Sequence, residues 1–358
     1  MRKMGFRASV LIVIIVALLM AGGCTPLNRS IHMIGMNRTL EDIPYNQRAR
    51  ESLEGFQKLH PQWEIDFQLT RSSAHYLKAI QKSLASEAGY IWSLEPQMAE
   101  EILDIARQNP TRKFIIVDWH PENPGDYLKN VLYIRYLEHE GSFLMGVVAG
   151  ETTESGTVGF VGGLKDEVGA RYEAGFRAGL AYSNPEATVL VDYIQSRSDN
   201  ARAADAAMEM VDAGADVLFH AAGTAGEGVA DICRENDIWF IGSDCDQNAL
   251  APDHTLTSML KRIDNVAGLV NRDISEGIFP GGQLLWMGAR ETAVSFSRSS
   301  LDRELTYQLD DLGYHITAGE LWIADNPEES PLFEIRPHEN DHDHDHDHDH
   351  DHDHDHDH

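Results

Sequence analysis

The sequence predicts an α/β protein made of doubly wound parallel sheets that are divided between two lobes. Short apolar stretches of strand length alternate with longer stretches whose apolar residues recur at helical spacing. This alternation is typical of parallel sheets, because each crossover between parallel strands is usually a helix. The 358 residues are enough for two units of roughly 100–200 residues each.

The expected strands and helices cover most of residues 31–287. Residues Phe114–Val117 are all apolar, as expected of a strand that is covered on both faces. In the stretch that starts at Asn200, Ala203, Ala206 and Met210 share one helical face. The expected strands are Ile31–Met36, Glu64–Leu69, Tyr90–Ser93, Phe114–Asp118, Val131–Tyr136, Thr157–Val161, Thr188–Tyr193, Asp216–His220, Ile238–Gly242, Thr255–Leu260 and Gln283–Met287. The expected helices are Tyr45–Leu59, Pro96–Gln108, Ser142–Glu151, Val168–Ala181, Asn200–Ala213, Gly226–Asn236 and Ile263–Ile274.

The N-terminus has the pattern of a lipoprotein signal peptide. Three basic residues precede an apolar run of 12 residues, Val10–Ala21, which is too short to span a bilayer comfortably. The run ends in Ala21-Gly22-Gly23-Cys24, where small residues precede a thiol that can be acylated and resemble a lipobox. We therefore expect residues 1–23 to be removed and residues 24–30 to form a linker anchored through Cys24. A plain signal peptide or a short membrane anchor is the alternative.

The other two cysteines, Cys233 and Cys245, lie on opposite sides of the strand Ile238–Gly242. A helix-then-strand arrangement separates them by roughly 15 Å at the rise of an extended chain. We expect two separate buried thiols, because a disulfide needs much closer Cα atoms.

The chain is strongly acidic, with 58 Asp and Glu against 29 Lys and Arg and a formal net charge of −29. Because nucleic-acid binding needs a basic face, we expect no nucleic-acid partner. Residues 341–358 are nine Asp-His dipeptides without an apolar residue, and we expect residues 336–358 to be a disordered tail. Imidazole and carboxylate groups bind zinc and similar divalent ions. The candidate metal ligands are His342, His344, His346, His348, His350, His352, His354, His356 and His358.

Polar residues directly after the apolar strands are the candidates for a binding site. In doubly wound sheets, ligands bind beyond the carboxyl ends of the strands. The four candidates are Asp118, Arg197, His220 and Asp244. Each could instead cap a helix or bond a loop, but four such positions favour a shared cleft. Gly223 opens a glycine-rich turn at a helix start, which can offer backbone N–H groups to a ligand oxygen or can be a flexible turn.

Motifs of catalysis are missing from the sequence. Residues 159–163, Gly-Phe-Val-Gly-Gly, match neither a dinucleotide fingerprint nor a P-loop. There is no Gly-x-Ser-x-Gly elbow and no His-Glu-x-x-His pair. We therefore expect a protein that is not an enzyme and needs no cofactor. An enzyme that lacks these motifs is the alternative.

Six stretches follow one another in order in the middle of the chain. They are Glu140–Gly146, Gly156–Gly163, Tyr172–Gly179, Ala221–Val229, Ile241–Gln247 and Leu256–Lys261. Together they resemble the basic membrane protein (BMP) family of ABC-transporter lipoproteins. The likeness covers roughly residues 31–298 and is dense from 140 to 264.

This resemblance implies a type I periplasmic-binding-protein fold, in which two α/β lobes joined by a hinge of three crossovers clamp a ligand. We expect residues 31–140 and 255–285 in the first lobe. We expect residues 141–254 and 286–335 in the second.

The resemblance also implies a site for purine nucleosides. Tyr45 and Asn46 match an aromatic-Asn pair at the start of the first helix, and Asp118 matches an acid that contacts the base. Asp244 and Lys261 match the acid and the lysine that hold the ribose hydroxyls. These residue types suit the chemistry, because carboxylates accept hydroxyl donors and an aromatic face stacks on a base.

Two positions depart from the family pattern. Asn37 stands where relatives have an acid that contacts the base. Arg197 stands where relatives have a second stacking aromatic. A guanidinium can stack on a purine, or it can bind a carboxylate or phosphate.

The function expected from these features is the lipid-anchored solute-binding component of an ABC importer. Its partners would be a nucleoside-like ligand, a permease and the membrane, and the protein would be a monomer. It would face the periplasm or exterior from the plasma or outer membrane. The alternative is a metal-handling or sensory lipoprotein that uses the Asp-His tail and holds a different solute in the cleft.

Overall fold

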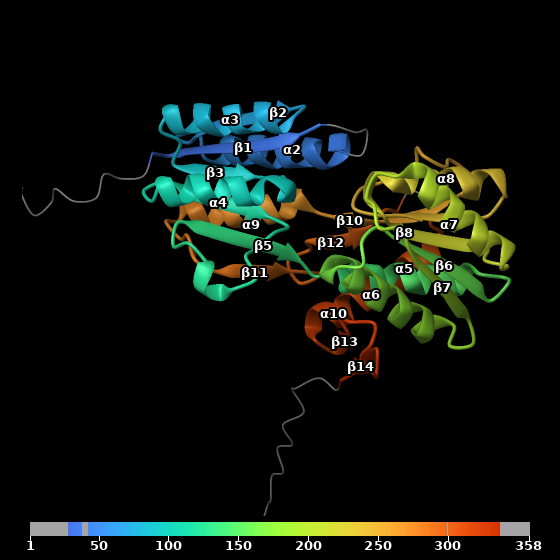
Figure 1. Ribbon diagram of the computed structural model, residues 1–358. Coiled ribbons are helices and arrows are strands. Elements are labelled where there is room, and N and C mark those ends of the chain that lie inside the picture. Colours follow the sequence, from blue (N-terminus) through green and yellow to red (C-terminus); the bar gives the residue numbers. More distant parts are fainter. Residues whose placement is uncertain (1–27, 38–41, 299, 337–358) are drawn as a thin grey trace, which may run out of the picture.

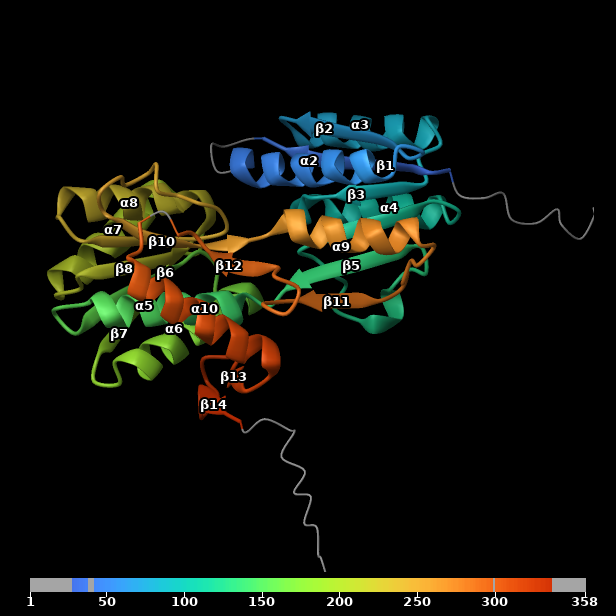
Figure 2. The same ribbon diagram turned by 180° about the vertical axis from the view of Figure 1, so that it is seen from behind.

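The computed structural model describes residues 28–37, 42–298 and 300–336, which form two α/β lobes side by side (Figures 1 and 2). Each lobe is built on a six-stranded sheet. The strand order is β11-β5-β4-β3-β1-β2 in the first lobe and β12-β10-β9-β8-β6-β7 in the second. All neighbouring strands of the two sheets are parallel except β10 and β12, so the predicted doubly wound parallel architecture is confirmed.

The first sheet carries helices on both faces. One buried cluster joins it to α2 and α9, and another joins it to α3 and α4. Helices α2 and α9 lie against each other in both views, and the Ser52 hydroxyl of α2 donates to the Asp264 carbonyl of α9 over 2.7 Å. The elements are β1 (Ser30–Met36), α2 (Asp42–Leu59), β2 (Glu64–Thr70), α3 (Ser73–Ala85), β3 (Tyr90–Ser93), α4 (Ala99–Gln108), β4 (Lys113–Val117), β5 (Val131–Tyr136), α9 (Ile263–Ser275) and β11 (Leu284–Met287).

The second sheet is covered by α5 and α6 on one face and by α7 and α8 on the other. Helices α5 and α6 approach so closely that a Cβ at Gly146 would lie 2.1 Å from the Phe176 carbonyl oxygen. The elements are α5 (Glu138–Thr152), β6 (Thr157–Gly162), α6 (Glu167–Ser183), β7 (Thr188–Tyr193), α7 (Asn200–Asp212), β8 (Val217–Ala221), α8 (Gly226–Glu235), β9 (Trp239–Gly242), β10 (Thr255–Lys261) and β12 (Val294–Phe296).

The chain crosses between the two lobes three times. It crosses from β5 to α5 at Leu137, from β10 to α9 at Arg262, and from β11 to β12 through residues 288–293. Strand β10 is hydrogen-bonded to β9 and β12, so it belongs to the second sheet. The sequence-based division, which assigned residues 255–285 to the first lobe, therefore differs from the observed pairing at β10.

A small C-terminal unit packs beneath the second lobe (Figure 1). It consists of α10 (Arg303–Ala318) and the antiparallel pair β13 (Leu321–Ile323) and β14 (Phe333–Ile335). Neither this unit nor α3 is among the expected elements. The sequence does contain boundary signals for α10, because Asp302 caps its start and Gly319 ends it at φ 75°.

Two further sequence expectations can be compared with the structure. Helix α5 starts at Glu138, four residues before the expected Ser142. The sequence pattern does not reveal this start, because nearly all faces of the helix are buried and its apolar residues do not lie on one side. Cys233 and Cys245 are both free and buried, which confirms two separate thiols. In the ranges that the structure describes, no helix is long and apolar enough to cross a membrane.

Candidate functional site

Two aspartates mark the carboxyl ends of equivalent strands in the two lobes. Asp118 follows β4 and Asp244 follows β9. Both residues have left-handed backbone conformations, with φ of 63° and 66°. A non-glycine residue in this region costs of order 1–3 kcal/mol and persists only where the surrounding structure fixes it. Such positions occur at ligand sites, so Asp118 and Asp244 stay candidates for the site.

Lys261 connects these two acids. It ends β10, and its Nζ atom lies 2.7 Å from Asp118 Oδ2 and 3.9 Å from Asp244 Oδ1. The same Nζ lies 3.0 Å from Glu138 Oε1, at the start of α5. The ammonium also stands over the ring of Tyr136, 5.1 Å from its centroid. The structure therefore brings together three predicted site residues, Asp118, Asp244 and Lys261.

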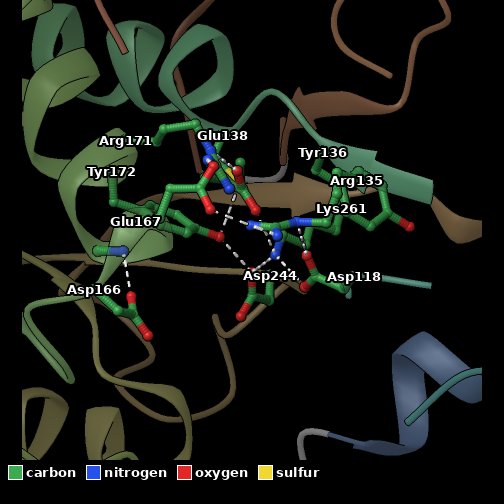
Figure 3. Close-up of polar contacts among 12 residues, drawn as sticks. Asp118, Arg135, Tyr136, Glu138, Asp166, Glu167, Arg171, Tyr172, Asp244 and Lys261 are labelled. Atoms are coloured by element: carbon green, nitrogen blue, oxygen red, sulfur yellow. Dashed lines mark hydrogen bonds and ion pairs between the residues drawn. The ribbon is translucent and has the colours of Figure 1, made fainter. Parts of the chain in front are cut away.

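Six alternating charges form a closed ring around this contact, which we call the charge ring (Figure 3). Its tight links are Lys261–Asp118, Lys261–Glu138, Arg171–Glu138 and Arg171–Glu167, with N···O distances of 2.6–3.0 Å. Its loose links are Arg135–Asp118 at 3.6 Å and Arg135–Glu167 at 3.8 Å. The ring contains side chains from both lobes and from two of the three crossings.

Attraction between opposite charges in the ring outweighs the effect of burial on the pKa of Asp118 and of Lys261. Burial alone would raise the pKa of Asp118, but Lys261 and Arg135 hold that pKa below its usual value. Burial alone would lower the pKa of Lys261, but Asp118, Glu138 and Asp244 raise it. Lys261 is therefore an ammonium and Asp118 a carboxylate at neutral pH, the states in which they bind hydroxyl and N–H groups.

The remaining predicted residues of the first lobe lie close to Met36. Asn46 is buried, and its Nδ2 donates to the Met36 carbonyl over 2.8 Å and to Asn37 Oδ1 over 2.7 Å. Asn46 Oδ1 is buried without a hydrogen-bond partner. The Tyr45 hydroxyl lies 3.4 Å from that of Tyr136, and burial raises the pKa of Tyr45. Asn37, Tyr45 and Asn46 thus form one local group next to the end of β1.

Asp244 is held by the second lobe. The Tyr172 hydroxyl of α6 donates to Asp244 Oδ1 over 2.5 Å. The turn before Asp244 is fixed by Gln247, whose Oε1 accepts from the Ser243 N–H and lies 2.7 Å from His220 Nε2. His220 is fully buried and stacks on Phe240. The expectation that His220 lines a shared cleft is therefore wrong, because the imidazole is a core group that supports the Asp244 turn.

Arg197 and Gly223 lie next to each other in the second lobe. Arg197 forms an ion pair of 2.5 Å with Asp166, the residue that caps α6. Gly223 has φ 57°, and a Cβ there would lie 2.9 Å from the Arg197 carbonyl oxygen. The glycine therefore allows the turn to approach the segment that carries Arg197, which is a structural reason for glycine at this position.

Arg135, Glu138, Glu167 and Arg171 were not among the predicted site residues. Arg135 had a usable signal, since it is the only charged residue in the strand Val131–Tyr136. Glu167 and Arg171 are four residues apart on one helix, which is the spacing of an ion pair, but nothing local indicates that Glu138 and Arg135 join them. The predicted Cys24 and the nine tail histidines lie outside the described residues. Among residues that the structure describes, no group of three His, Cys, Asp or Glu side chains could hold a metal ion.

The fold and the convergence of these residues between the lobes define a solute-binding protein of the type I periplasmic-binding-protein class. The family model described as "ABC transporter substrate-binding protein PnrA-like" matches residues 31–326. The chain belongs to this Bmp family, whose members are extracytoplasmic substrate-binding components of ABC importers.

Curated relatives agree with this assignment. The chain is 30% identical over 320 residues to a CD4+ T-cell-stimulating antigen of Listeria innocua, covering 83% of this chain and 88% of that protein. It is 28% identical over 302 residues to basic membrane protein A of Borreliella burgdorferi, covering 82% and 88%.

Solved structures share the fold at lower identity. A solute-binding protein from Conexibacter woesei has a TM-score of 0.67 at 20% identity, covering 83% of this chain and 98% of that one. One from Aeropyrum pernix has a TM-score of 0.65 at 18% identity, covering 85% and 95%.

Proposed function

We propose that this protein is the lipid-anchored receptor of an ABC importer and that it binds a nucleoside-like ligand between its lobes. The observation that carries the proposal is that the carboxylates of Asp118 and Asp244 both lie within 4 Å of the Lys261 ammonium. These three side chains come from distant parts of the chain and offer both acceptors and a donor. A nucleoside presents complementary groups, with N–H and ring nitrogen atoms on the base and paired hydroxyls on the ribose.

The base would lie on the side of the first lobe. Asp118 Oδ1 and Asn46 Oδ1 are both buried acceptors without a hydrogen-bond partner. An unpaired buried polar atom costs roughly 1–3 kcal/mol, so a ligand that donates N–H groups to these oxygens gains that amount. Tyr45 adjoins Asn46 and would supply the aromatic face.

The ribose would lie on the side of the second lobe. The Asp244 side chain is 47% exposed, so its carboxylate is open to ligand hydroxyls although Tyr172 already donates to it. The Lys261 ammonium has three N–H donors, and its two close acceptors among the described residues are Asp118 and Glu138, at 2.7 and 3.0 Å, so a donor remains for a ligand. Its closeness to Asp244 would let both groups bind the same diol.

The remainder of the proposal concerns the cell envelope. Lipidation of Cys24 would hold a monomer at the plasma or outer membrane, facing the periplasm or exterior, where it would deliver its ligand to a permease. Several acyl chains on one cysteine would anchor the protein stably, whereas one chain binds a membrane only marginally. We propose no catalytic step.

Calorimetry on the folded protein tests the ligand. Guanosine, inosine and adenosine would be titrated into the wild type, into Asp244→Ala and into the matched control Asp231→Ala, an exposed acid on α8. We expect binding by the wild type and the control. Loss of a hydrogen-bonded charge should weaken the Asp244→Ala variant by about 2–5 kcal/mol. Absence of binding by the wild type would refute the nucleoside proposal, and unchanged affinity in Asp244→Ala would remove Asp244 from the site.

A further inference from the structure

Two guanidinium groups in the charge ring are buried and incompletely hydrogen-bonded. Arg135 is 6% exposed and Arg171 is 2% exposed. Arg135 Nη2 and Arg171 Nη2 have no hydrogen-bond partner, and Arg135 Nε has only the loose ion-pair contact of 3.6 Å with Asp118 Oδ1. A charged donor that is buried without a close acceptor is unfavourable, so these atoms indicate that an acceptor group belongs there.

The two guanidiniums come from opposite lobes and share the same neighbours. Arg135 is the last residue but one of β5 and pairs in register with Trp286 of the adjacent strand β11. Arg135 Cζ and Arg171 Cζ lie 5.4 and 5.0 Å from the centre of the Trp286 ring. Arg171 belongs to α6 of the second lobe. The pair therefore faces a common space at the junction of the lobes.

The Glu167 carboxylate now occupies this space (Figure 3). Its Oε1 lies 2.6 Å from Arg171 Nη1, and its Oε2 lies 3.8 Å from Arg135 Nη1. Unlike the arginines, the Glu167 side chain is 59% exposed. It sits on the first turn of a 17-residue helix, where backbone N–H groups favour a negative charge. Because this acid is at the surface, it can rotate away without disturbing the core.

We propose that the space between Arg135 and Arg171 is a subsite for an oxyanion of the ligand, and that Glu167 fills it when no ligand is bound. The proposal rests on the proposed function, because it assigns the ligand of the same site to the phosphorylated nucleosides. A phosphoryl group would take the position of the Glu167 carboxylate, and the glutamate would turn into solvent.

The number of donors favours a phosphoryl group over a carboxylate. The Glu167 carboxylate has two oxygens, and its two arginine neighbours carry three nitrogens without a hydrogen-bond partner, Arg135 Nε, Arg135 Nη2 and Arg171 Nη2. A terminal phosphoryl group offers three oxygens, and arginine pairs bind it with planar, bidentate geometry.

The local charge balance permits this exchange. Without Glu167, three cations of the site (Lys261, Arg135 and Arg171) face three carboxylates (Asp118, Glu138 and Asp244). These six groups together carry no net charge. In the structure they hold one further anion, the Glu167 carboxylate. Arg197 pairs with Asp166 beside Glu167, so this ion pair leaves the balance unchanged.

Calorimetric titration of the whole protein with inorganic phosphate tests the subsite without depending on the base. The variants are Glu167→Gln, which removes the internal competitor, Arg135→Gln, which removes a donor, and the matched control Glu186→Gln, an exposed acid after α6. We expect Glu167→Gln to bind phosphate at least about tenfold more tightly than the wild type, because a charge-assisted bond no longer competes. Arg135→Gln should bind about tenfold more weakly, and Glu186→Gln should match the wild type.

Guanosine and guanosine 5′-monophosphate separate this inference from the proposed function. Tighter binding of the monophosphate than of guanosine, with a larger difference in Glu167→Gln, supports the subsite. If guanosine binds while phosphate gives no heat and Glu167→Gln equals the wild type, the subsite is refuted and the nucleoside proposal stands. If phosphate binds as expected and guanosine does not, the nucleoside proposal falls. Tighter binding of acetate than of phosphate would overturn the phosphoryl assignment. Should Arg135→Gln fail to fold, the surface variant Glu167→Gln still decides the question.

Discussion

The ammonium of Lys261 lies 2.7 Å from the carboxylate of Asp118, and this ion pair joins the ends of the two sheets. Lys261 ends β10 in the second sheet, and Asp118 directly follows β4 in the first. A separation of the lobes at this point would leave a buried charge on each side. The contact therefore links the position of the lobes to the occupancy of the site between them.

Replacement of Lys261 by methionine should lower the free energy of unfolding by about 3–5 kcal/mol. Methionine fills a similar volume but leaves Asp118 and the fully buried Glu138 without their shared cation. Urea denaturation of the variant measures this loss. The control Lys78→Met removes an exposed lysine from α3 and should change stability by less than about 0.5 kcal/mol. Equal stability of both variants would show that the charge ring is not coupled to folding.

Glu140 should make the protein less stable as the pH rises toward neutrality. Burial raises the pKa of Glu140 from 4.5 to about 7, although the Ala289 N–H donates to its Oε2. The folded state therefore holds a proton that the unfolded chain releases. The stabilisation is complete below pH 4.5 and disappears as the pH passes about 7.

The variant Glu140→Gln keeps an oxygen for the Ala289 N–H but cannot titrate. Between pH 5 and pH 8, the wild type should lose about 2–3 kcal/mol more unfolding free energy than this variant. Burial lowers the pKa of the neighbouring His139 to about 4, and this residue destabilises the fold in acid. Its effect is present in both proteins and cancels in the comparison. Parallel pH curves for the two proteins would contradict the prediction.

Arg197→Phe should shift the ligand preference toward neutral purine nucleosides. The substitution restores a stacking surface and removes a cation that now pairs with Asp166. The ratio of guanosine affinity to guanosine 5′-monophosphate affinity should rise in this variant. Arg202→Phe, on the first turn of α7, controls for a new aromatic in the same lobe. An unchanged ranking of ligands would mean that Arg197 serves only the surface pair.

Cys24→Ala should release the protein from the membrane fraction of cells. The alanine side chain cannot be acylated, so the chain that remains after removal of residues 1–23 would lack its lipid anchor. Fractionation followed by detection of the protein gives the result. If the variant remains with the membrane as the wild type does, lipidation at Cys24 is not the anchor.

The Asp-His repeat should bind several zinc ions weakly, independently of the nucleoside site. Only the neutral imidazole binds a metal ion, so metal binding should weaken in mild acid as imidazole groups become protonated. A zinc titration would compare the full chain with a chain that ends at Asn340. Equal zinc uptake by both would exclude the repeat, and a zinc-dependent change in nucleoside affinity would show coupling between tail and site.

The sequence alone predicts the elements whose evidence is local. The uniformly apolar run Phe114–Val117 indicates a central strand. Asp118 can be predicted as a site residue because it follows this strand, and ligands of parallel sheets bind beyond the carboxyl ends of the strands. Lys261 was found through family likeness. The charge ring depends on tertiary structure, since Glu138 and Arg171 are 33 residues apart and meet only after α5 and α6 pack together.

Misjudged elements have physical reasons as well. Buried residues lie on nearly all faces of α5, so no single apolar face marks where the helix starts. The lobe to which β10 belongs depends on its hydrogen bonds to β9 and β12, which no local pattern reports. His220 looked like a strand-end residue, but its strand continues to Ala221 and the imidazole turns into the core.

The late position of strand β11 in the chain makes an unfinished chain prone to aggregation during synthesis. It is the last strand of the first sheet and covers the outer edge of β5, yet it is made about 150 residues after its partner. Until Leu284–Met287 arrives, the buried strand Val131–Tyr136 has an open row of backbone hydrogen-bonding groups. Such an edge is a template for pairing with another chain. A chain truncated before Leu284 would therefore tend to self-associate through β5, and an unfinished chain needs protection until its last third has emerged.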